Sequence, residues 1–449
     1  MINLRDDGWD IKNGGGNFRL REKDLYFKPY ITWSRISSSQ IAFRLLEKGV
    51  LFADAAPGIF AKEKCLNLLA FLNSKLSDHF LKGMNPTLNF QTNDIESLPY
   101  FDANTTDIVG QLVSMSMVDW NSFESSWGFK GLSYVNGTHF GSNISVSWNT
   151  WNQFSKVQVR TAKDFEEQNN RLFITAYGLQ DELTPEVPES QITLARAARE
   201  KDSQRLISYA IGCMMGRYSL DEPGLIYAHA GNVGFEPGRY ATFPADADGI
   251  VPITDELWFA DDACSRIREF LRAVWGPDTL EENMAWLAES LGTKASETPD
   301  ETIRRYIADK FFKDHLQTYK KRPIYWLFSS GKQGAFQALV YLHRYSEGTL
   351  SRLRAEYVVP LTGKIQSRIE MLQKDALAAS STAARNKLAK EVEKLKKKHV
   401  ELLAYDEQLR HYADMRITLD LDDGVKVNYG KFGDLLDSVK VVTGGAGDE

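Results

Sequence analysis

Cysteine is scarce in this sequence: 449 residues contain only Cys65, Cys213 and Cys264. The three are far apart and form no Cys-x-x-Cys pair, which argues against a zinc site and against a disulfide framework. We expect buried thiols in a reducing compartment, which predicts a cytoplasmic protein. Long apolar runs are also missing, since none approaches the roughly 20 residues needed to cross a bilayer.

An excess of positive charge is missing as well. The formal net charge is -6, which argues against a uniformly basic nucleic-acid coat. A local basic groove stays compatible with it, because binding depends on where charges lie rather than on their sum. The composition, 43% hydrophobic and 25% charged, is typical of globular proteins, and the length allows two to four domains.

Motifs for nucleotides and calcium are incomplete. "FSSGKQGAF" has the Gly-Lys of a P-loop but not its first Gly, and "NGGGNF" is followed by no helical pattern. "AHAGNVGFEPG" has glycines without a strand and helix around them. "DLDDG" lacks the ligand spacing and closing Glu of a calcium loop. The sequence therefore predicts no cofactor and no metal in this chain.

The patterns predict an α+β protein in which a small β-rich unit precedes mainly helical domains. Residues 17–60 alternate β-branched and aromatic residues with Pro and Gly, and an amphipathic helix is expected over 63–84. We expect the domains 1–105 (β-rich with one helix), 106–200 (a loop-rich and helical insertion), 201–360 (mainly helical), 361–415 (an antiparallel helical hairpin) and 416–449 (a β-hairpin turning at Asp423-Gly424, with a flexible tail). "RPIYWLFSSGKQGAFQALVYLHRY" predicts one or two buried strands followed by a helix.

The hairpin has the clearest periodicity of the chain. Its apolar residues step by three and four, as in a coiled coil, at Ile365, Ile369, Leu372, Ala376 and Ala379 and again at Leu388, Val392, Leu395, His399, Leu402 and Leu409. We expect His399 on the seam between the two helices as a polar residue that sets the register.

Several stretches together resemble one family. They are "GNFRLREKDLYFKPYITWSRISSS", "LLAFLNSKLSDHFLKGMNPTLNFQTNDIESLPYF", "LISYAIGCMMGRYSLDEPGLIYA", "DGIVPITDELWFADDACSRIREFLRAVWG", "KRPIYWLFSSGKQGAFQALVYLHRY" and "LDLDDGVKVNYGKFGDLL". In this order they resemble the C-terminal portion, including the target-recognition region, of the adenine-specific DNA methyltransferases of bacterial BREX phage-defence systems (PglX). The resemblance implies binding of double-stranded DNA and docking to other phage-defence proteins.

The motifs of the family's catalytic N-terminal domain are not found here. The resemblance implies a Rossmann-like domain that binds S-adenosylmethionine and an Asn-Pro-Pro-Tyr loop that holds the flipped adenine. In this chain Thr87 follows Asn85-Pro86, and the next aromatic residue is Phe90. We therefore expect no catalytic residue in this chain, no methylation by it alone, and S-adenosylmethionine only in the full-length enzyme.

Polar and basic side chains near the N-terminus are the first candidates for DNA contacts. Arg is the usual reader of guanine, Gln and Asn are the usual readers of adenine, and Lys and Arg meet phosphates. The predicted DNA-binding residues are Arg35, Ser37, Ser38, Ser39, Gln40, Arg44, Lys62, Asn85, Asn89, Gln91, Lys320, Lys321 and Arg322, with Lys64, Lys75 and Lys82 as further cations. The alternative for Asn85 and Asn89 is that they cap turns.

Two further basic runs have simpler alternatives. Lys320–Arg322 end a run that starts at Arg304 and can be the solvated face of a helix whose Ile303, Ile307 and Phe311 pack inward. "KLAKEVEKLKKKHVE" can be a solvated face of the hairpin or a contact for a partner.

Two functions fit these observations. The first is the DNA target-recognition and C-terminal part of a site-specific adenine-N6 methyltransferase, which selects the site for a catalytic half. The second is a non-catalytic interaction module that docks to that half and to other defence proteins without binding DNA alone. A nuclease is disfavoured, because no carboxylate cluster with a nearby Lys lies on the predicted strands.

Overall fold

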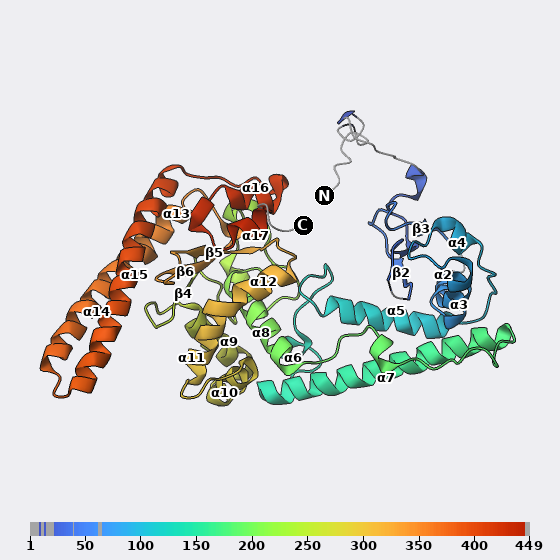
Figure 1. Ribbon diagram of the computed structural model, residues 1–449, viewed down its shortest axis with the longest axis horizontal. Coiled ribbons are helices and arrows are strands. Elements are labelled where there is room, and N and C mark those ends of the chain that lie inside the picture. Colours follow the sequence, from blue (N-terminus) through green and yellow to red (C-terminus); the bar gives the residue numbers. More distant parts are fainter. Residues whose placement is uncertain (1–8, 10–12, 15–21, 39, 62–64, 445–449) are drawn as a thin grey trace. The chain divides into compact units, whose positions relative to one another are not determined.

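The computed structural model describes residues 9, 13–14, 22–38, 40–61 and 65–444 (Figure 1). The chain divides into an N-terminal unit, Met1–Asp119 with Val157–Ala195, and a C-terminal unit, Trp120–Lys156 with Arg196–Glu449. Each unit has its own hydrophobic core and, within the described residues, a three-stranded antiparallel sheet. Helices make up most of the rest, which confirms the predicted α+β class.

The sheet of the N-terminal unit is built around one buried strand. β1 (Tyr30–Trp33) lies between β2 (Phe43–Leu46) and β3 (Gly58–Ile59), and all four of its residues are buried. The register pairs Trp33 with Phe43. Aromatic and β-branched residues suit a strand covered on both faces, which explains why the composition of residues 17–60 predicted strands here.

The single helix expected over 63–84 is two helices, α2 (Cys65–Leu72) and α3 (Lys75–Met84). The break follows from two polar side chains between them. Asn73 exchanges hydrogen bonds of 3.0 Å with both the N–H and the C=O of Phe43, and Ser74 Oγ accepts from Ser77 N at the start of α3. Side-chain bonds to the backbone compete with helix continuation, and a period of 3.6 alone does not reveal them. Residues 62–64 lie outside the described part.

Helices occupy much of the segment predicted as a loop-rich and helical insertion. α4 (Thr92–Glu96), α5 (Thr106–Asn121), α6 (Ser133–Asn136) and α7 (Ile144–Ala176) are the helices of residues 85–198. The Ser, Asn and Trp residues after Ile144 are helical, because α7 begins at Ile144. Asn143 Oδ1 accepts from Val146 N at the beginning of α7, and Ile144 and Trp151 are buried on the same face. Capping and burial thus outweigh the low helix propensity of Ser, Asn and Trp.

The C-terminal unit surrounds a second sheet with helices. The strand order is β4 (Ile250–Ile253), β6 (Gln337–Tyr341), β5 (Tyr325–Ser329), and the buried strand pair expected within 322–345 is confirmed. Only a 3-10 turn, Leu342–Arg344, follows β6 where a helix was expected. The surrounding helices are α8 (Arg199–Met214), α9 (Ala263–Trp275), α10 (Leu280–Leu291), α11 (Pro299–Tyr306) and α12 (Phe312–Thr318).

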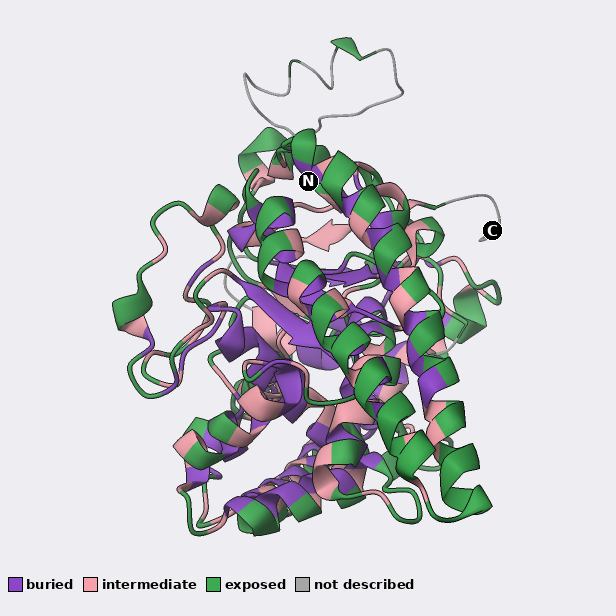
Figure 2. Cartoon of the chain, turned by 90° about the vertical axis from the view of Figure 1, so that its left-hand side faces the viewer, coloured by how far each residue is buried: buried purple, intermediate pink, exposed green. Residues whose placement is uncertain are grey.

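Two long helices form the predicted hairpin. α13 (Thr349–Arg352) leads through a π-helical turn into α14 (Val359–Ala378), and α15 (Thr382–Asp414) returns beside it (Figure 1). The outer faces are exposed, whereas Ile365, Ile369, Leu372, Val392, Leu395, Leu402 and Leu409 are buried (Figure 2). The buried polar residue is Lys398 rather than His399, which is half-buried.

The β-hairpin predicted for residues 416–449 is wrong in the part that the structure describes. That part contains α16 (Gly424–Gly430), α17 (Val439–Thr443) and two 3-10 turns. Asp420 Oδ1 accepts from Asp422 N at 3.0 Å, so the Asp-Gly pair starts a helix instead of a hairpin turn. Tyr429 and Phe432 then pack against Trp326 of β5. This burial selects the helix over the alternating pattern of the sequence. Residues 445–449, part of the expected flexible tail, lie outside the described part.

Candidate nucleic-acid interface

Two predicted recognition segments, distant in the sequence, lie side by side in the N-terminal unit. Ile36 forms an antiparallel bridge with Asn89. Ser37 N donates to Leu88 O at 2.9 Å, and Phe90 N donates to Arg35 O at 2.7 Å. Trp33 Nε1 also donates to Phe90 O at 3.0 Å, which anchors the pair to the end of β1. We call residues 34–38 and 85–91 together the paired loops.

Arg35 is held loosely at this surface by one carboxylate. Its Nη1 lies 2.7 Å from Asp54 Oδ2, and the Asp54 side chain is 94% exposed. Exposed ion pairs contribute little, on the order of 0–1 kcal/mol, so a phosphate can replace Asp54 at small cost. Arg44 is exposed on β2, where it pairs with Thr32 of β1. Arg35 therefore lies in the loop after β1, and Arg44 lies on the strand paired with β1.

The paired loops also expose apolar and neutral polar side chains. Ile36 is 74% exposed and Leu88 is 58% exposed. Aliphatic side chains at a DNA surface contact the thymine methyl group in the major groove. Ser38 and Gln40 are exposed as well, Ser37 is half-buried, and Ser39 and Lys62 lie outside the described residues.

Asn85 organises its own loop. Its Nδ2 donates to Asn89 O at 3.0 Å and to Asp94 Oδ2 at 2.8 Å, and its Oδ1 accepts from Thr87 N and Thr87 Oγ1. The amide is thus used at both ends inside the loop, which supports the turn-capping alternative for Asn85. Gln91 precedes α4 and its N–H donates to Asp94 Oδ2 at 2.7 Å, while its side chain is exposed.

Asn89 differs from Asn85 in its unused hydrogen-bonding capacity. Its Oδ1 is buried and has no hydrogen-bond partner among the residues that the structure describes.

Two further predicted cations are engaged locally: Lys75 Nζ donates to the carbonyl of Glu186, and Lys82 pairs with Asp78 at 2.6 Å. Arg35 and Arg44, which reach the surface, are therefore the stronger candidates for DNA contacts in this unit.

The second predicted set belongs to the C-terminal unit. Lys320, Lys321 and Arg322 are exposed on the turn after α12, where Lys320 and Lys321 have left-handed φ angles of 51° and 61°. Buried His315 holds the end of this turn, because its Nε2 accepts from Ile324 N at 3.1 Å and from Tyr325 N at 3.2 Å. Burial, aided by the charge of Arg217, lowers the pKa of His315 to about 3, so it is a neutral acceptor.

The start of the same basic run has an internal role. Arg304 forms an ion pair with buried Asp262, and Arg305 Nε lies 2.7 Å from Glu297 Oε1. Ile303, Ile307 and Phe311 are buried, as the solvated-helix alternative predicts. The exposed cations of the run are Lys310, Lys313 and Lys320–Arg322.

The tryptophans of the predicted insertion, residues 106–200, divide between the core and the surface. Trp151 is buried and Trp148 Nε1 donates to Asp202 Oδ2 at 3.0 Å, so both anchor the C-terminal unit. Trp127, by contrast, is 97% exposed. No group of three or more His, Cys, Asp and Glu side chains is arranged for a metal ion in the described residues, and no helix there is long and apolar enough to span a membrane.

Comparison with known proteins gives two extensive matches. The chain is 43% identical, over 99% of its length, to the adenine-specific methyltransferase BrxX of Escherichia coli O9:H4 (strain HS). It is 39% identical, over 90% of its length, to the adenine-specific methyltransferase PglX of Lacticaseibacillus casei (strain Zhang). The chain is homologous to the BREX adenine-specific methyltransferases BrxX and PglX. No protein-family model matches it.

The homology covers a portion of these enzymes. The chain spans 39% of the length of the Escherichia coli BrxX and 34% of the length of the Lacticaseibacillus casei PglX. The homology extends across both units, since the first match takes in nearly the whole chain.

The sequence indicated the basic and polar residues of the paired loops by residue type. It did not indicate Asp54 as the partner of Arg35, because no sequence pattern links the two residues.

Proposed function

We propose that this chain is the DNA target-recognition and C-terminal part of a site-specific adenine-N6 DNA methyltransferase of a BREX phage-defence system. Homology to BrxX and PglX supports this function. The complete enzyme would transfer a methyl group from S-adenosylmethionine to adenine N6, with catalytic residues outside this chain. The proposed setting is the cytoplasm, with duplex DNA, the catalytic half and other defence proteins as partners.

The observation that carries the recognition role is the pairing of residues 34–38 with 85–91. The backbone bonds between Arg35, Ser37, Leu88 and Phe90 hold two polar loops in one fixed surface. A preorganised surface loses less conformational entropy on binding than two independent loops do. Arg35 then moves from Asp54 to a phosphate or a guanine edge, and Arg44 contacts the backbone.

The alternative is a docking module that binds DNA only together with the catalytic half. The net charge of -6 is the observation that favours it. A separating experiment is fluorescence anisotropy of the purified chain with random-sequence duplex DNA at low and moderate salt. The variants are Arg35→Ala/Arg44→Ala, Lys320→Ala/Lys321→Ala/Arg322→Ala and, as a control, Arg171→Gln on α7, which is exposed in the same unit as the paired loops.

The recognition role predicts binding that weakens steeply with salt, because each phosphate contact releases counterions. The Arg35→Ala/Arg44→Ala variant should bind at least tenfold more weakly, since two contacts of about 1 kcal/mol or more are lost. Arg171→Gln should bind like the wild type. Absence of binding by the wild type at low salt would contradict autonomous DNA binding and favour the docking module.

A further inference from the structure

A carboxylate on the hairpin fixes a surface loop of the C-terminal unit. The loop between β5 and β6, residues 330–336, packs on Glu401 of α15. Glu401 accepts from Ser330 Oγ at 2.8 Å, Gln333 N at 2.7 Å and Ala335 N at 3.1 Å. The loop has one defined conformation as a result, and its tip exposes Lys332 and Gln333 beside the helix.

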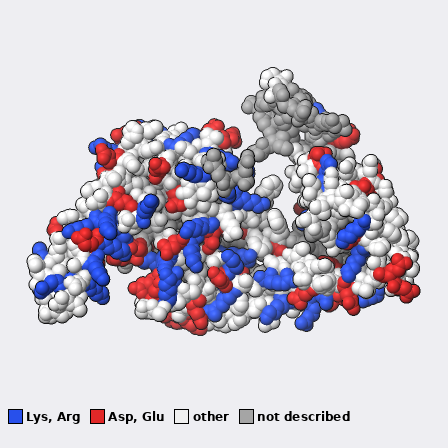
Figure 3. Space-filling model, in the orientation of Figure 1, with Lys and Arg blue, Asp and Glu red and all other residues white. Residues whose placement is uncertain are grey.

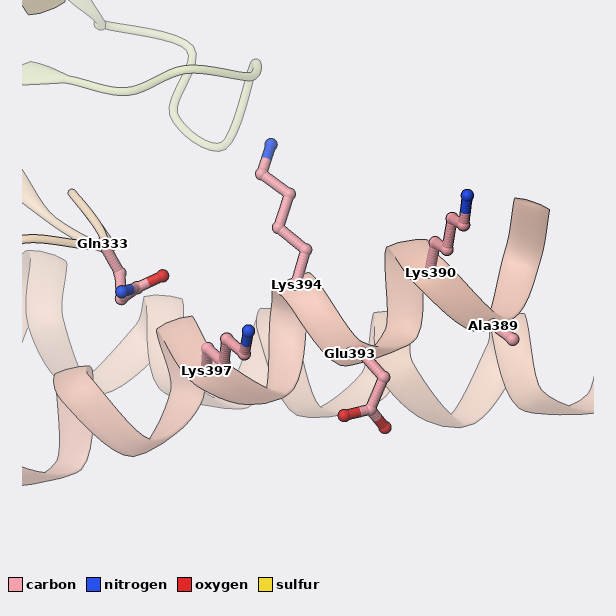
Figure 4. Close-up of a pocket in the computed structure, with 6 residues that line it drawn as sticks. All are labelled: Gln333, Ala389, Lys390, Glu393, Lys394 and Lys397. Carbon is pink, nitrogen blue, oxygen red and sulfur yellow. The ribbon is translucent and has the colours of Figure 1, made fainter. Parts of the chain in front are cut away.

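Three lysines of α15 share a hollow with this loop. Lys390, Lys394 and Lys397 follow one another at four and three residues, the spacing of one helix face. With Gln333, Ala389 and Glu393 they line an open hollow of about 400 Å³. Figure 4 shows the three ammonium groups directed to one side of the helix and the Glu393 carboxylate directed to the other. We call Lys390, Lys394 and Lys397 the lysine face.

The acidic residues nearby neutralise this face only in part. Residues 385–401 contain seven Lys and Arg against three Glu, in a chain that is acidic overall, and blue side chains mark the hairpin in Figure 3. Glu401 is engaged by the loop, and Glu391 lies 3.5 Å from Arg368 of α14. Asp255 contacts Lys394 at 3.3 Å, but its shorter bond, 2.5 Å, is to buried Lys398.

We propose that the lysine face binds the phosphate backbone of duplex DNA, as a contact separate from the paired loops. The helical rise of about 1.5 Å per residue puts the lysines in a row with axial steps of roughly 6 and 4.5 Å. A row of mobile point charges suits an extended polyanion of regular charge spacing. Gln333 at the hollow adds an amide donor for a phosphate oxygen. The inference rests on the proposed function, in that it assumes that the chain meets DNA.

The test compares two triple variants of the full chain that remove equal charge. Lys390→Gln/Lys394→Gln/Lys397→Gln changes the lysine face. Lys201→Gln/Lys374→Gln/Lys440→Gln removes three exposed lysines from α8, α14 and α17 as a control. Circular dichroism establishes that both fold, and affinity for a random-sequence duplex is then measured over a series of salt concentrations.

We expect weaker binding by the lysine-face variant and a salt dependence of log K that is shallower by about 2.7, because three phosphate contacts are lost at about 0.9 each. The control should keep the wild-type slope. An unchanged affinity and slope in the lysine-face variant would overturn the inference and leave an acidic protein as the fitting partner. If Arg35→Ala/Arg44→Ala still weakens binding in that case, the proposed function survives, so the two failures are distinguishable.

Discussion

Arg35 and Asp54 form an ion pair of 2.7 Å in which the arginine is half-buried and the aspartate is almost fully exposed. The guanidinium is thereby kept at the surface of the paired loops with a partner that water already screens. Such a pair holds Arg35 weakly, because the exposed carboxylate of Asp54 loses little free energy when another anion takes its place.

Asp54→Asn should therefore strengthen DNA binding. The substitution removes both the competitor for Arg35 and a negative charge beside the proposed phosphate path, and we expect a gain of up to about fivefold at low salt. Asp181→Asn, which removes an exposed carboxylate elsewhere in the N-terminal unit, serves as the control. Weaker binding by Asp54→Asn, measured by anisotropy, would mean that the pair preorganises Arg35 rather than competing for it.

Glu401 should contribute to stability through the loop that it holds. In Glu401→Ala, the two N–H groups and the hydroxyl that it binds lose their acceptor, which should lower the free energy of unfolding by about 1–3 kcal/mol. Glu393→Ala is the matched control on the same helix, because Glu393 pairs with the exposed Lys396 at 3.3 Å. Urea denaturation followed by circular dichroism measures both. Equal stabilities of the two variants would mean that the hydrogen bonds between Glu401 and the loop do not stabilise the protein.

Lys398 and Asp255 should make the C-terminal unit sensitive to acid. Burial raises the pKa of Asp255, but the hydrogen bond and charge of Lys398, with the charge of Lys394, outweigh burial and lower it overall. A carboxyl whose folded pKa lies below its unfolded pKa stabilises the protein above the unfolded value, and this contribution is lost as pH falls through the folded pKa.

Lys398→Met retains the apolar stem and removes the charge. It should cost about 1–3 kcal/mol at neutral pH, because Asp255 loses its main partner. The difference from the wild type should shrink as pH falls from the unfolded pKa of about 4 through the lower folded pKa of Asp255. Lys396→Met is the control, since Lys396 pairs with Glu393 at the surface. A difference that stays constant from neutral to acid pH would exclude the ion pair as its cause.

His315 should add a second pH dependence at higher pH. Its folded pKa of about 3 lies below the usual value near 6.5, because burial disfavours the charged ring. The unfolded chain binds the proton first, so this contribution is complete above about pH 6.5 and is lost as pH falls towards 3, at up to roughly 1.4 kcal/mol per pH unit.

The His315→Gln variant should show a flatter dependence of unfolding free energy on pH between 6.5 and 5 than the wild type. Identical slopes in wild type and His315→Gln would mean that the ring is protonated in the folded protein, in conflict with its two backbone N–H donors.

The sequence predicted elements whose apolar pattern reflects burial within one segment. The strands around Trp326 and Leu339 and the helices around Ile369 and Leu402 are of this kind. It did not predict the break at Asn73, because that break depends on hydrogen bonds to Phe43, 30 residues away. The tail was predicted wrongly for the same reason: Tyr429 of α16 and Phe432 of the turn that follows it pack on Trp326 of β5, a contact distant in the sequence.

The candidate interface, too, was predictable from residue type but not in its long-range contacts. Residue type and local order identified Arg35 and Arg44 as candidates, but only the fold aligns residues 34–38 with 85–91, because that alignment consists of long-range backbone bonds. Asn85 could not be separated from Asn89 by sequence, since both are loop asparagines. The helical period assigned His399 to the seam, whereas the structure buries the neighbouring Lys398, whose charge reaches Asp255.

Hydrogen–deuterium exchange of the chain, with and without a random-sequence duplex at low salt, tests the central claim most directly. If the paired loops bind DNA, peptides that cover residues 34–38 and 85–91 should exchange more slowly in the complex. Peptides from α7 should exchange at the same rate in both states. DNA binding without protection of either loop would contradict recognition by this surface.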